Sequence, residues 1–427
     1  MSIYWFLEEM AATLPSTSSE HHFSISNIIS KFRSKKGTSN RKSDAQPPQE
    51  ILQETRLPLK PAPLPLVLPE HQQTLSALGW TTVTFPDSSP AQSEATDHEH
   101  QAPAPGPHPL QAAYEQLFAA SQAFFNQPDK EKQRWKHKLR SEEGWSKIPG
   151  EKEFITLRSL EYCPEVLRGP AKRYWDLVGQ HCSNTLGRIS TSLGLPNGED
   201  EGLRQFVGPC GTLQASDREK TATMLRLFRY EGWEAKVVAE PHADLGLLSV
   251  VVGDVPGLEV WDGANWFEVE KVVENSRMKG ATMLTGRQLE RLSNGRYPAG
   301  GHRVVAYGSP EPSPNPPVST SQASSTIHDP ASSTDDKRYR FSIVFVLRAH
   351  EALIINSDSF ETEVTGKWLE PMNGITAGRF YEKIRGQHFN INIDMDEREK
   401  QRNKLNNVKG GKKQGWEVKE GKVVSSG

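Results

Sequence analysis

The chain has 427 residues, enough for one large domain or two smaller ones, and only 35% of them are hydrophobic. Its 51 basic and 53 acidic side chains nearly balance, which argues against a protein built mainly to bind nucleic acid. The low hydrophobic fraction and a mean hydropathy of -0.63 predict that part of the chain is disordered.

The cysteines are too few and too scattered for a disulfide framework or a zinc cluster: Cys163, Cys182 and Cys210. Reduced thiols are typical of an intracellular protein. The first ten residues lack the basic and apolar regions of a secretory signal, and no apolar run is long enough to span a membrane. We therefore expect an intracellular protein in the cytoplasm, with no membrane partner.

Residues 1–70 read as a disordered N-terminal tail, because Ser/Thr clusters and a Pro-rich segment offer little apolar surface to bury. The basic stretch from Lys31 to Lys42 is compatible with a nuclear-import or membrane-surface signal. A solvated tail is the favoured interpretation.

Residues 71–215 are predicted to form an N-terminal helical region. A short strand is expected over 79–86, and apolar residues at helical spacing predict a helix over 110–125. Pro128 should begin the next turn. A second long helix is predicted from Pro170 to Leu193, with Gly194 as its C-cap.

Residues 216–395 contain many short strand-like runs broken by Gly, Asp and Pro, which indicates a sandwich or a jelly roll rather than alternating β/α units. The run WFEVE is read as the second strand of a hairpin that turns at Asp262 and Gly263. A short helix or turn is expected over 285–295. Residues 309–337 are predicted to be a disordered insertion, and 396–427 a charged C-terminal tail.

Three residues of the second half could hold a divalent metal. His242 and Asp244 are one residue apart, so on a strand both side chains would point to the same face. His302, at the start of another predicted strand, offers a second imidazole. Two histidines and one carboxylate suit iron(II) and leave coordination positions open, although each residue alone would more often be structural.

Arg340 and Ser342, in YRFSIVFV, have the same spacing on a predicted strand. A guanidinium binds a carboxylate through two hydrogen bonds, and a hydroxyl adds a third. The pair therefore suits the distal carboxylate of a dicarboxylic acid. The alternative is a surface ion pair for the arginine and an ordinary sheet position for the serine.

Taken in order, these pieces resemble the iron(II)- and 2-oxoglutarate-dependent dioxygenases of the isopenicillin N synthase-like family. The resemblance covers about residues 75–395, and its second half is the specific part. The residues that carry it are Tyr230, Pro241-His242-Ala243-Asp244-Leu245-Gly246-Leu247-Leu248, Gly257-Leu258-Glu259-Val260, Trp266, Ser293-Asn294-Gly295-Arg296-Tyr297, His302-Arg303-Val304 and Arg340-Phe341-Ser342. In the first half, FFNQPDKEK from Phe124 and EEGW from Glu142 match as well.

The resemblance implies a mainly β fold with flanking helices around a double-stranded β-helix (jelly roll) core. His242, Asp244 and His302 would bind Fe(II), Arg340 and Ser342 would bind 2-oxoglutarate, and Tyr230 would contact this co-substrate. Leu248 and Phe345 would line the pocket or the core. The implied enzyme consumes O2, releases succinate and CO2, hydroxylates or desaturates a small molecule, and is expected to be a monomer.

The sequence also departs from the family pattern. Glu231-Gly232-Trp233 replaces the usual Pro-Pro after Tyr230, and Phe228 stands where a polar residue is common. Two alternatives therefore stay open. One is an iron-dependent oxidase that does not use 2-oxoglutarate, and the other is a catalytically decayed jelly roll that serves as a scaffold.

Overall fold

The computed structural model describes residues 56–85, 108–137, 142–231, 235–275, 279–308, 339–388, 390–393 and 395–408. All of them belong to one unit, residues 50–427. The basic stretch near residue 35, the predicted insertion over 309–337 and residues 409–427 lie outside the described residues. None of the helices in the described ranges is long and apolar enough to cross a bilayer.

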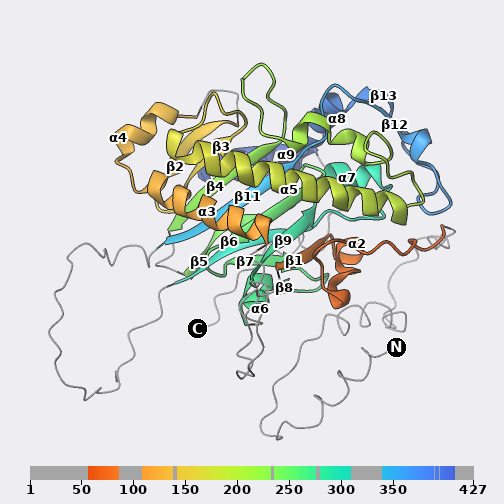
Figure 1. Ribbon diagram of the computed structural model, residues 1–427, viewed down its shortest axis with the longest axis horizontal. Coiled ribbons are helices and arrows are strands. Elements are labelled where there is room, and N and C mark those ends of the chain that lie inside the picture. Colours follow the sequence, from red (N-terminus) through yellow and green to blue (C-terminus); the bar gives the residue numbers. More distant parts are fainter. Residues whose placement is uncertain are drawn as a thin grey trace, which may run out of the picture. The chain divides into compact units, whose positions relative to one another are not determined.

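Two antiparallel sheets dominate the fold (Figure 1). The larger sheet has seven strands, in the order β1 (Trp80–Phe85), β9 (Lys279–Thr285), β6 (Leu248–Gly253), β11 (Tyr339–Leu347), β4 (Met224–Glu231), β3 (Lys152–Leu157) and β2 (Gly144–Ile148). The smaller sheet has the order β5 (Ala235–His242), β10 (His302–Tyr307), β7 (Leu258–Trp261) and β8 (Trp266–Phe267). A separate pair joins β12 (Ile354–Asn356) to β13 (Asn373–Thr376).

Helices cover one face of the larger sheet and border the strands elsewhere. The α-helices are α2 (Thr74–Leu78), α3 (Pro109–Phe125), α4 (Asp129–Lys132), α5 (Glu165–Ser192), α6 (Val269–Asn275), α7 (Arg287–Leu292), α8 (Ala377–Arg385) and α9 (Met395–Val408). Single 3-10 turns are η2 (Pro69–His71), η3 (Gln133–Trp135), η4 (Arg204–Phe206), η5 (Gly208–Gly211) and η7 (Ser357–Phe360). The predicted mainly β architecture with flanking helices is confirmed.

The two faces of the larger sheet have different roles. On β11, Phe341 and Phe345 point toward the helices: the Phe125 and Phe341 ring centroids are 6.2 Å apart, and those of Trp175 and Phe345 are 5.3 Å apart. Figure 1 shows α3 and α5 running along this face. Phe345 and Leu248 are both fully buried in this helix-side core. Both residues therefore belong to the core and not to a pocket.

The opposite face of the larger sheet is turned toward the smaller sheet. Side chains alternate along a strand, so Arg340 and Ser342 point away from the helices. The Arg340 Nε donates to the carbonyl of Val255, just before β7, at 3.0 Å. The Lys152 Nζ, on β3, donates to the carbonyl of Val238 on β5 at 3.3 Å. Polar side chains of the larger sheet thus reach the smaller sheet across the space between them.

Several predicted elements are confirmed, among them the strand at 80–85, the helix at 109–125, the turn after Pro128 and the short helix at 287–292. The hairpin is also present: β7 pairs with β8, and Gly263 at its turn has a φ of 96°. Gly194 has a φ of 75° directly after the C-cap residue of α5, as predicted for the end of that helix.

Two element boundaries were wrong. The long helix begins at Glu165 and contains Pro170, because Leu167 and Ala171 are fully buried and hold its first turns against the core. Second, the run WFEVE is not a continuous strand, since β8 ends at Phe267 and α6 begins at Val269. The residues around Glu270 gave no sign that its side chain is held by Arg340, far along the chain.

Residues 56–70, placed by the sequence in the N-terminal tail, form contacts with later elements. The Leu57 amide donates to the Glu363 carbonyl, and the Lys60 amide donates to the Ser192 carbonyl, both at 2.9 Å. The Leu64 side chain is buried. This stretch therefore packs against the rest of the unit even though only a single 3-10 turn interrupts its irregular course.

A close backbone approach positions the segment that leads into β10. Gly79 has a φ of 79°, and a Cβ atom there would lie 2.4 Å from the Pro298 carbonyl oxygen and 2.6 Å from the Gly300 amide nitrogen. Gly150 has nearly the same φ of 78°, but a Cβ atom there would meet nothing within 4 Å. A substitution at Gly150 therefore introduces only the strain of a positive φ, whereas one at Gly79 adds a steric clash to the same strain.

We expect Gly79→Ala to lower the free energy of unfolding by about 3 kcal/mol, because it adds a backbone clash to the cost of positive φ. Gly150→Ala, which has only the conformational cost, should lose about 1 kcal/mol. Urea unfolding of both variants measures the difference. Equal losses would show that the contact between residue 79 and the 298–300 segment contributes nothing.

Candidate metal centre

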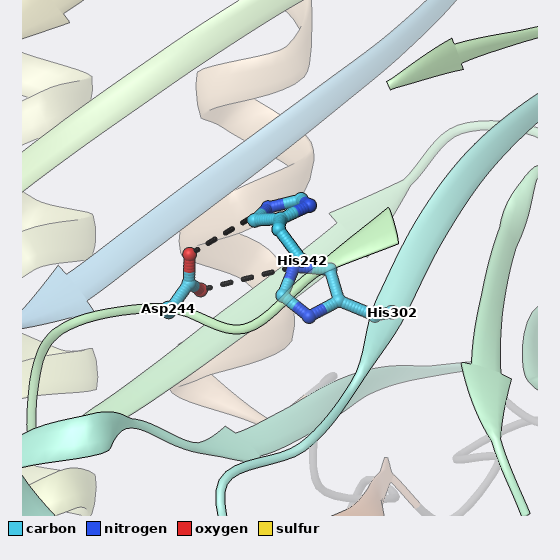
Figure 2. A group of neighbouring side chains, drawn as sticks. All are labelled: His242, Asp244 and His302. Carbon is cyan, nitrogen blue, oxygen red and sulfur yellow. Dashed lines mark ion pairs between the residues drawn. The ribbon is translucent and has the colours of Figure 1, made fainter. Parts of the chain in front are cut away.

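The smaller sheet brings His242 and His302 together. His242 is the last residue of β5 and His302 the first of β10, and the two are paired across the antiparallel ladder. Their ring centroids lie 4.1 Å apart. Asp244 lies two residues past the end of β5, not on a strand as the sequence predicted. It still reaches the same point, because the chain turns toward the two rings after His242 (Figure 2).

The three side chains form a compact set of potential ligands. One ligand atom from each lies within 4.8 Å of the other two. The His242 Nε2 is 3.9 Å from Asp244 Oδ1, and the His302 Nε2 is 4.0 Å from Asp244 Oδ2. Figure 2 shows the carboxylate directed at both rings. These separations are too long for hydrogen bonds and leave room for an ion between the groups.

Backbone carbonyls fix the orientation of both imidazoles. The His242 Nδ1 lies 2.7 Å from the Glu240 carbonyl oxygen, and the His302 Nδ1 lies 3.1 Å from the Gly300 carbonyl oxygen. A carbonyl only accepts hydrogen bonds, so each Nδ1 must carry the proton. In the neutral form of each ring, Nε2 then presents its lone pair toward Asp244, which is the arrangement that metal-binding histidines use.

The electrostatics favour the ligand forms of these groups. Burial, assisted by the neighbouring His302, lowers the pKa of His242 to about 3, so this imidazole is neutral at physiological pH. Burial alone would raise the pKa of Asp244, but the adjacent His302 and His242 bring it below its ordinary value. Asp244 Oδ2 is buried and has no hydrogen-bond partner among the described residues. A buried charged oxygen without a donor is costly unless a cation binds it.

The predicted carboxylate-binding arginine already has a carboxylate partner. The Arg340 Nη2 donates to both carboxylate oxygens of Glu270, at 3.0 and 2.8 Å. Glu270 Oε2 also accepts from the amides of Gly257 and Leu258, at 2.9 and 2.8 Å. Arg340 is 3% exposed, so this ion pair is buried. Its Nη1 is buried and has no hydrogen-bond partner in the described ranges.

Two glycines make room for the ion pair. A Cβ atom on Gly253 would lie 2.5 Å from Arg340 Nη2 and 2.6 Å from Glu270 Oε1. A Cβ atom on Gly257 would lie 2.5 Å from Arg340 Nε. The backbone of β6 and the segment before β7 thus closely surround the guanidinium.

Tyr230 and Ser342 lie beside Arg340 on the inner face. Tyr230 pairs with Arg340 across β4 and β11, and the guanidinium carbon is 5.6 Å from the centre of its ring. Burial raises the pKa of the Tyr230 phenol to about 12, although Arg340 and the Ser342 hydroxyl act to lower it. Phe228 stacks on Tyr230 with a centroid distance of 5.1 Å. The structure therefore brings Arg340, Ser342 and Tyr230 together.

Sequence reasoning missed Glu270 and two buried cations, Arg226 and Lys152, on the same inner face. Arg226 and Tyr230 are four residues apart on β4, so the alternation along MLRLFRYE could have indicated that both point inward. Glu270 had no such signal, because its partner is 70 residues away and its position depends on α6.

Comparisons with known proteins add a short sequence match and several distant structural ones. No protein-family model matches the chain. A segment of 88 residues is 34% identical to "Probable flavonol synthase 6" of Arabidopsis thaliana and covers 20% of this chain and 28% of that protein. The chain thus aligns with less than a third of the length of this relative.

Among solved structures, the chain is similar to a full-length Neurospora crassa protein in complex with alpha-KG and 5-formyluracil. Identity is 17%, 73% of this chain and 86% of that chain are covered, and the TM-score is 0.47. It is also similar to JOX2 in complex with 2OG, Fe and JA, with 16% identity, coverage of 77% of this chain and 83% of that chain, and a TM-score of 0.48. For the rice dioxygenase for auxin oxidation the identity is 17%, the coverage is 73% of this chain and 87% of that chain, and the TM-score is 0.45. The flavonol synthase match supports, over its 88 residues, the resemblance to the iron(II)- and 2-oxoglutarate-dependent dioxygenases predicted from the sequence.

Proposed function

We propose that this protein is an iron(II)- and 2-oxoglutarate-dependent oxygenase that hydroxylates or desaturates a small organic molecule. The observation that carries the proposal is the convergence of His242, Asp244 and His302, whose ligand atoms lie within 4.8 Å of one another. The similarity of one segment to a probable flavonol synthase points to the same class of small-molecule chemistry.

The three residues fit iron(II) by their donor set. Two imidazoles whose Nε2 atoms lie on the side of Asp244, together with one buried carboxylate, form the set that leaves coordination positions open for other ligands. The orphaned Asp244 Oδ2 gains a cation to bind, which removes the cost of burying it unpaired. Iron, when bound, would activate O2 and couple oxidation of the substrate to conversion of 2-oxoglutarate into succinate and CO2.

The inner face of the larger sheet would hold the co-substrate. Arg340 Nη1 and the Ser342 hydroxyl would donate to the distal carboxylate of 2-oxoglutarate, and the Tyr230 phenol would border it. The Phe228 ring, stacked on Tyr230, would help to exclude water. Burial strengthens these interactions, because a guanidinium shielded from water attracts a carboxylate more strongly than an exposed one does.

The test is succinate release by the purified full chain. The proposal requires that succinate form only when both iron(II) and 2-oxoglutarate are supplied, with one CO2 for each succinate. The control is the same protein with zinc in place of iron, which should release none. Succinate release that is independent of iron would contradict the proposal.

A second candidate, an iron-dependent oxidase that does not use 2-oxoglutarate, is favoured by one observation. Glu270 already neutralises Arg340, so the expected anion-binding group has no net charge to offer. Anaerobic calorimetry of the iron-loaded protein with 2-oxoglutarate separates the two candidates. Saturable binding at one site per chain supports the oxygenase, and no binding supports the oxidase.

We further propose that the two sheets form a double-stranded β-helix core over residues 216–395, with 71–215 as a helical region before it. The assignment is supported by the strands from β4 to β11, which lie in this range and supply the residues of both candidate sites except Asp244, which follows β5. The sequence placed tails at residues 1–70 and 396–427, but residues 56–70 pack against the unit and residues 396–408 lie in α9. We propose that the protein is a monomer in the cytoplasm, without nucleic-acid or membrane partners, in keeping with its three buried free cysteines.

A further inference from the structure

The inner face of the larger sheet carries a buried cation that the proposed iron and co-substrate sites do not use. Arg226, on β4, is 7% exposed. Its Nε donates to the Thr156 hydroxyl at 2.7 Å, and its Nη2 lies 3.4 Å from the Met224 sulfur. Neither contact supplies a negative charge. No carboxylate lies within ion-pair distance of Arg226 in the described part of the chain.

The other guanidiniums nearby are paired. Arg340 is paired with Glu270, and Arg348 with Glu142. Glu142 also acts electrostatically on Arg226, but the salt bridge that it forms is with Arg348. Asp244 also acts electrostatically on both guanidiniums, but it is one of the proposed metal ligands. With Asp244 bound to a metal, only the Glu142 carboxylate compensates Arg226 and Arg348, so one positive charge remains uncompensated, which is expensive for a folded protein unless something binds to it.

Arg226 points to the inner face of the larger sheet. It pairs with Val344 of β11 and Thr156 of β3, in the same sheet rows that direct Arg340 and Ser342 inward. Asp244 acts electrostatically on its guanidinium. An anionic group held there would lie on the same side of the sheet as the metal.

The surroundings of Arg226 indicate what kind of anion would fit. The Phe154 and Phe228 ring centroids lie 5.3 and 5.9 Å from the guanidinium carbon, so apolar surface flanks the charge. A single guanidinium matches one carboxylate, through two parallel hydrogen bonds.

We propose that Arg226 binds the carboxylate of the substrate, and that the substrate is a monocarboxylic acid with an apolar body. This rests on the proposed oxygenase function and narrows it to a class of substrate. Lys152, which is 1% exposed and lacks an ion-pair partner among the described residues, places a second nitrogen donor on the same face, and burial lowers the pKa of its ammonium group to about 7. Its influence extends to His242, as that of Arg226 extends to Asp244.

The test is a binding screen of matched pairs, each an organic monocarboxylic acid and its primary amide. The full chain is loaded with zinc(II) and saturated with 2-oxoglutarate, so that no turnover occurs and Arg340 is occupied. Ligand-observed NMR then ranks the compounds. We expect each acid that binds to have an affinity at least about tenfold higher than that of its amide. In Arg226→Met this ratio should fall to near one, and Arg226→Lys should restore part of it.

A matched control lies on the same strand. Arg229 points to the helix side, where its guanidinium carbon is 5.9 Å from the Phe125 ring centroid, so Arg229→Met should keep the preference for acids. Thermal unfolding of the ligand-free protein supplies a second readout. A buried arginine that has no anion bound to it destabilises the ligand-free protein. The Arg226→Met variant should therefore melt at the same temperature as wild type or higher.

Two results would overturn the proposal. One is a wild-type protein that selects no acid over its amide. The other is a preference for acids that survives in Arg226→Met while the melting temperature falls, which would make Arg226 a structural residue. Failure of the oxygenase proposal is distinguishable, since the screen measures binding without iron chemistry. Iron-dependent succinate release together with no preference for acids would reject only the substrate class.

Discussion

Asp244→Asn is expected to abolish iron binding and turnover while leaving the protein folded. Asparagine has nearly the same shape but lacks the negative charge that a divalent ion needs. Mutation of a residue that only supports a metal ligand often lowers metal affinity or activity by roughly ten- to a hundredfold. Loss of a ligand itself should therefore lower the affinity for iron by at least about a hundredfold. Iron content after anaerobic loading and gel filtration measures the effect, and succinate release follows it.

The same variant makes a prediction for the metal-free protein. The neighbouring His302 and His242 hold the pKa of Asp244 below its ordinary value, so its charge is favoured in the fold and removing it should lower the melting temperature of the apo form. Asp176→Asn is a suitable control, because that aspartate lies on α5 and pairs with Lys172. It should retain iron. An Asp244→Asn protein that binds iron as wild type does would remove the basis for the metal centre.

Glu270→Gln is expected to tighten the binding of 2-oxoglutarate by at least tenfold. The Glu270 carboxylate neutralises Arg340 and would repel the distal carboxylate of 2-oxoglutarate. Two negative charges about 6 Å apart interact by roughly 3 kcal/mol at an effective dielectric constant near 20. A tenfold change in affinity corresponds to only about 1.4 kcal/mol. Removing half of this repulsion would therefore be enough for the expected effect. Glutamine can still accept from the Gly257 and Leu258 amides, which preserves the position of α6.

Anaerobic calorimetry with iron-loaded protein measures this change, and Glu268→Gln is its control. Glu268 is two residues away, has a half-exposed side chain and pairs with Lys271, so its loss should leave the affinity unchanged. Melting curves must accompany the titration, because Arg340 loses its partner in the Glu270 variant. Weaker binding in a folded Glu270→Gln protein would contradict the prediction and show that Glu270 orients Arg340 for its ligand.

The sequence determined much of this protein because some chemistry is local. His242-Ala243-Asp244 places two ligand types one residue apart, and Arg340-Phe341-Ser342 places two donors on one face of a strand. Alternation along a strand follows from backbone geometry alone. The hairpin at Gly263 and the helix end at Gly194 were predictable for the same reason, since each depends on a positive φ that glycine adopts readily.

Only the tertiary structure decided which charges meet. Glu270 was read as part of a strand, but β8 ends at Phe267 and α6 carries its carboxylate to Arg340 and to the amides before β7. Likewise, the sequence could place Arg226 on a strand but could not show that no carboxylate in the described part of the chain would be near enough to pair with it. Ion pairs between residues distant in the chain depend on how elements pack, and this packing determines whether a buried arginine is neutralised or left for a ligand.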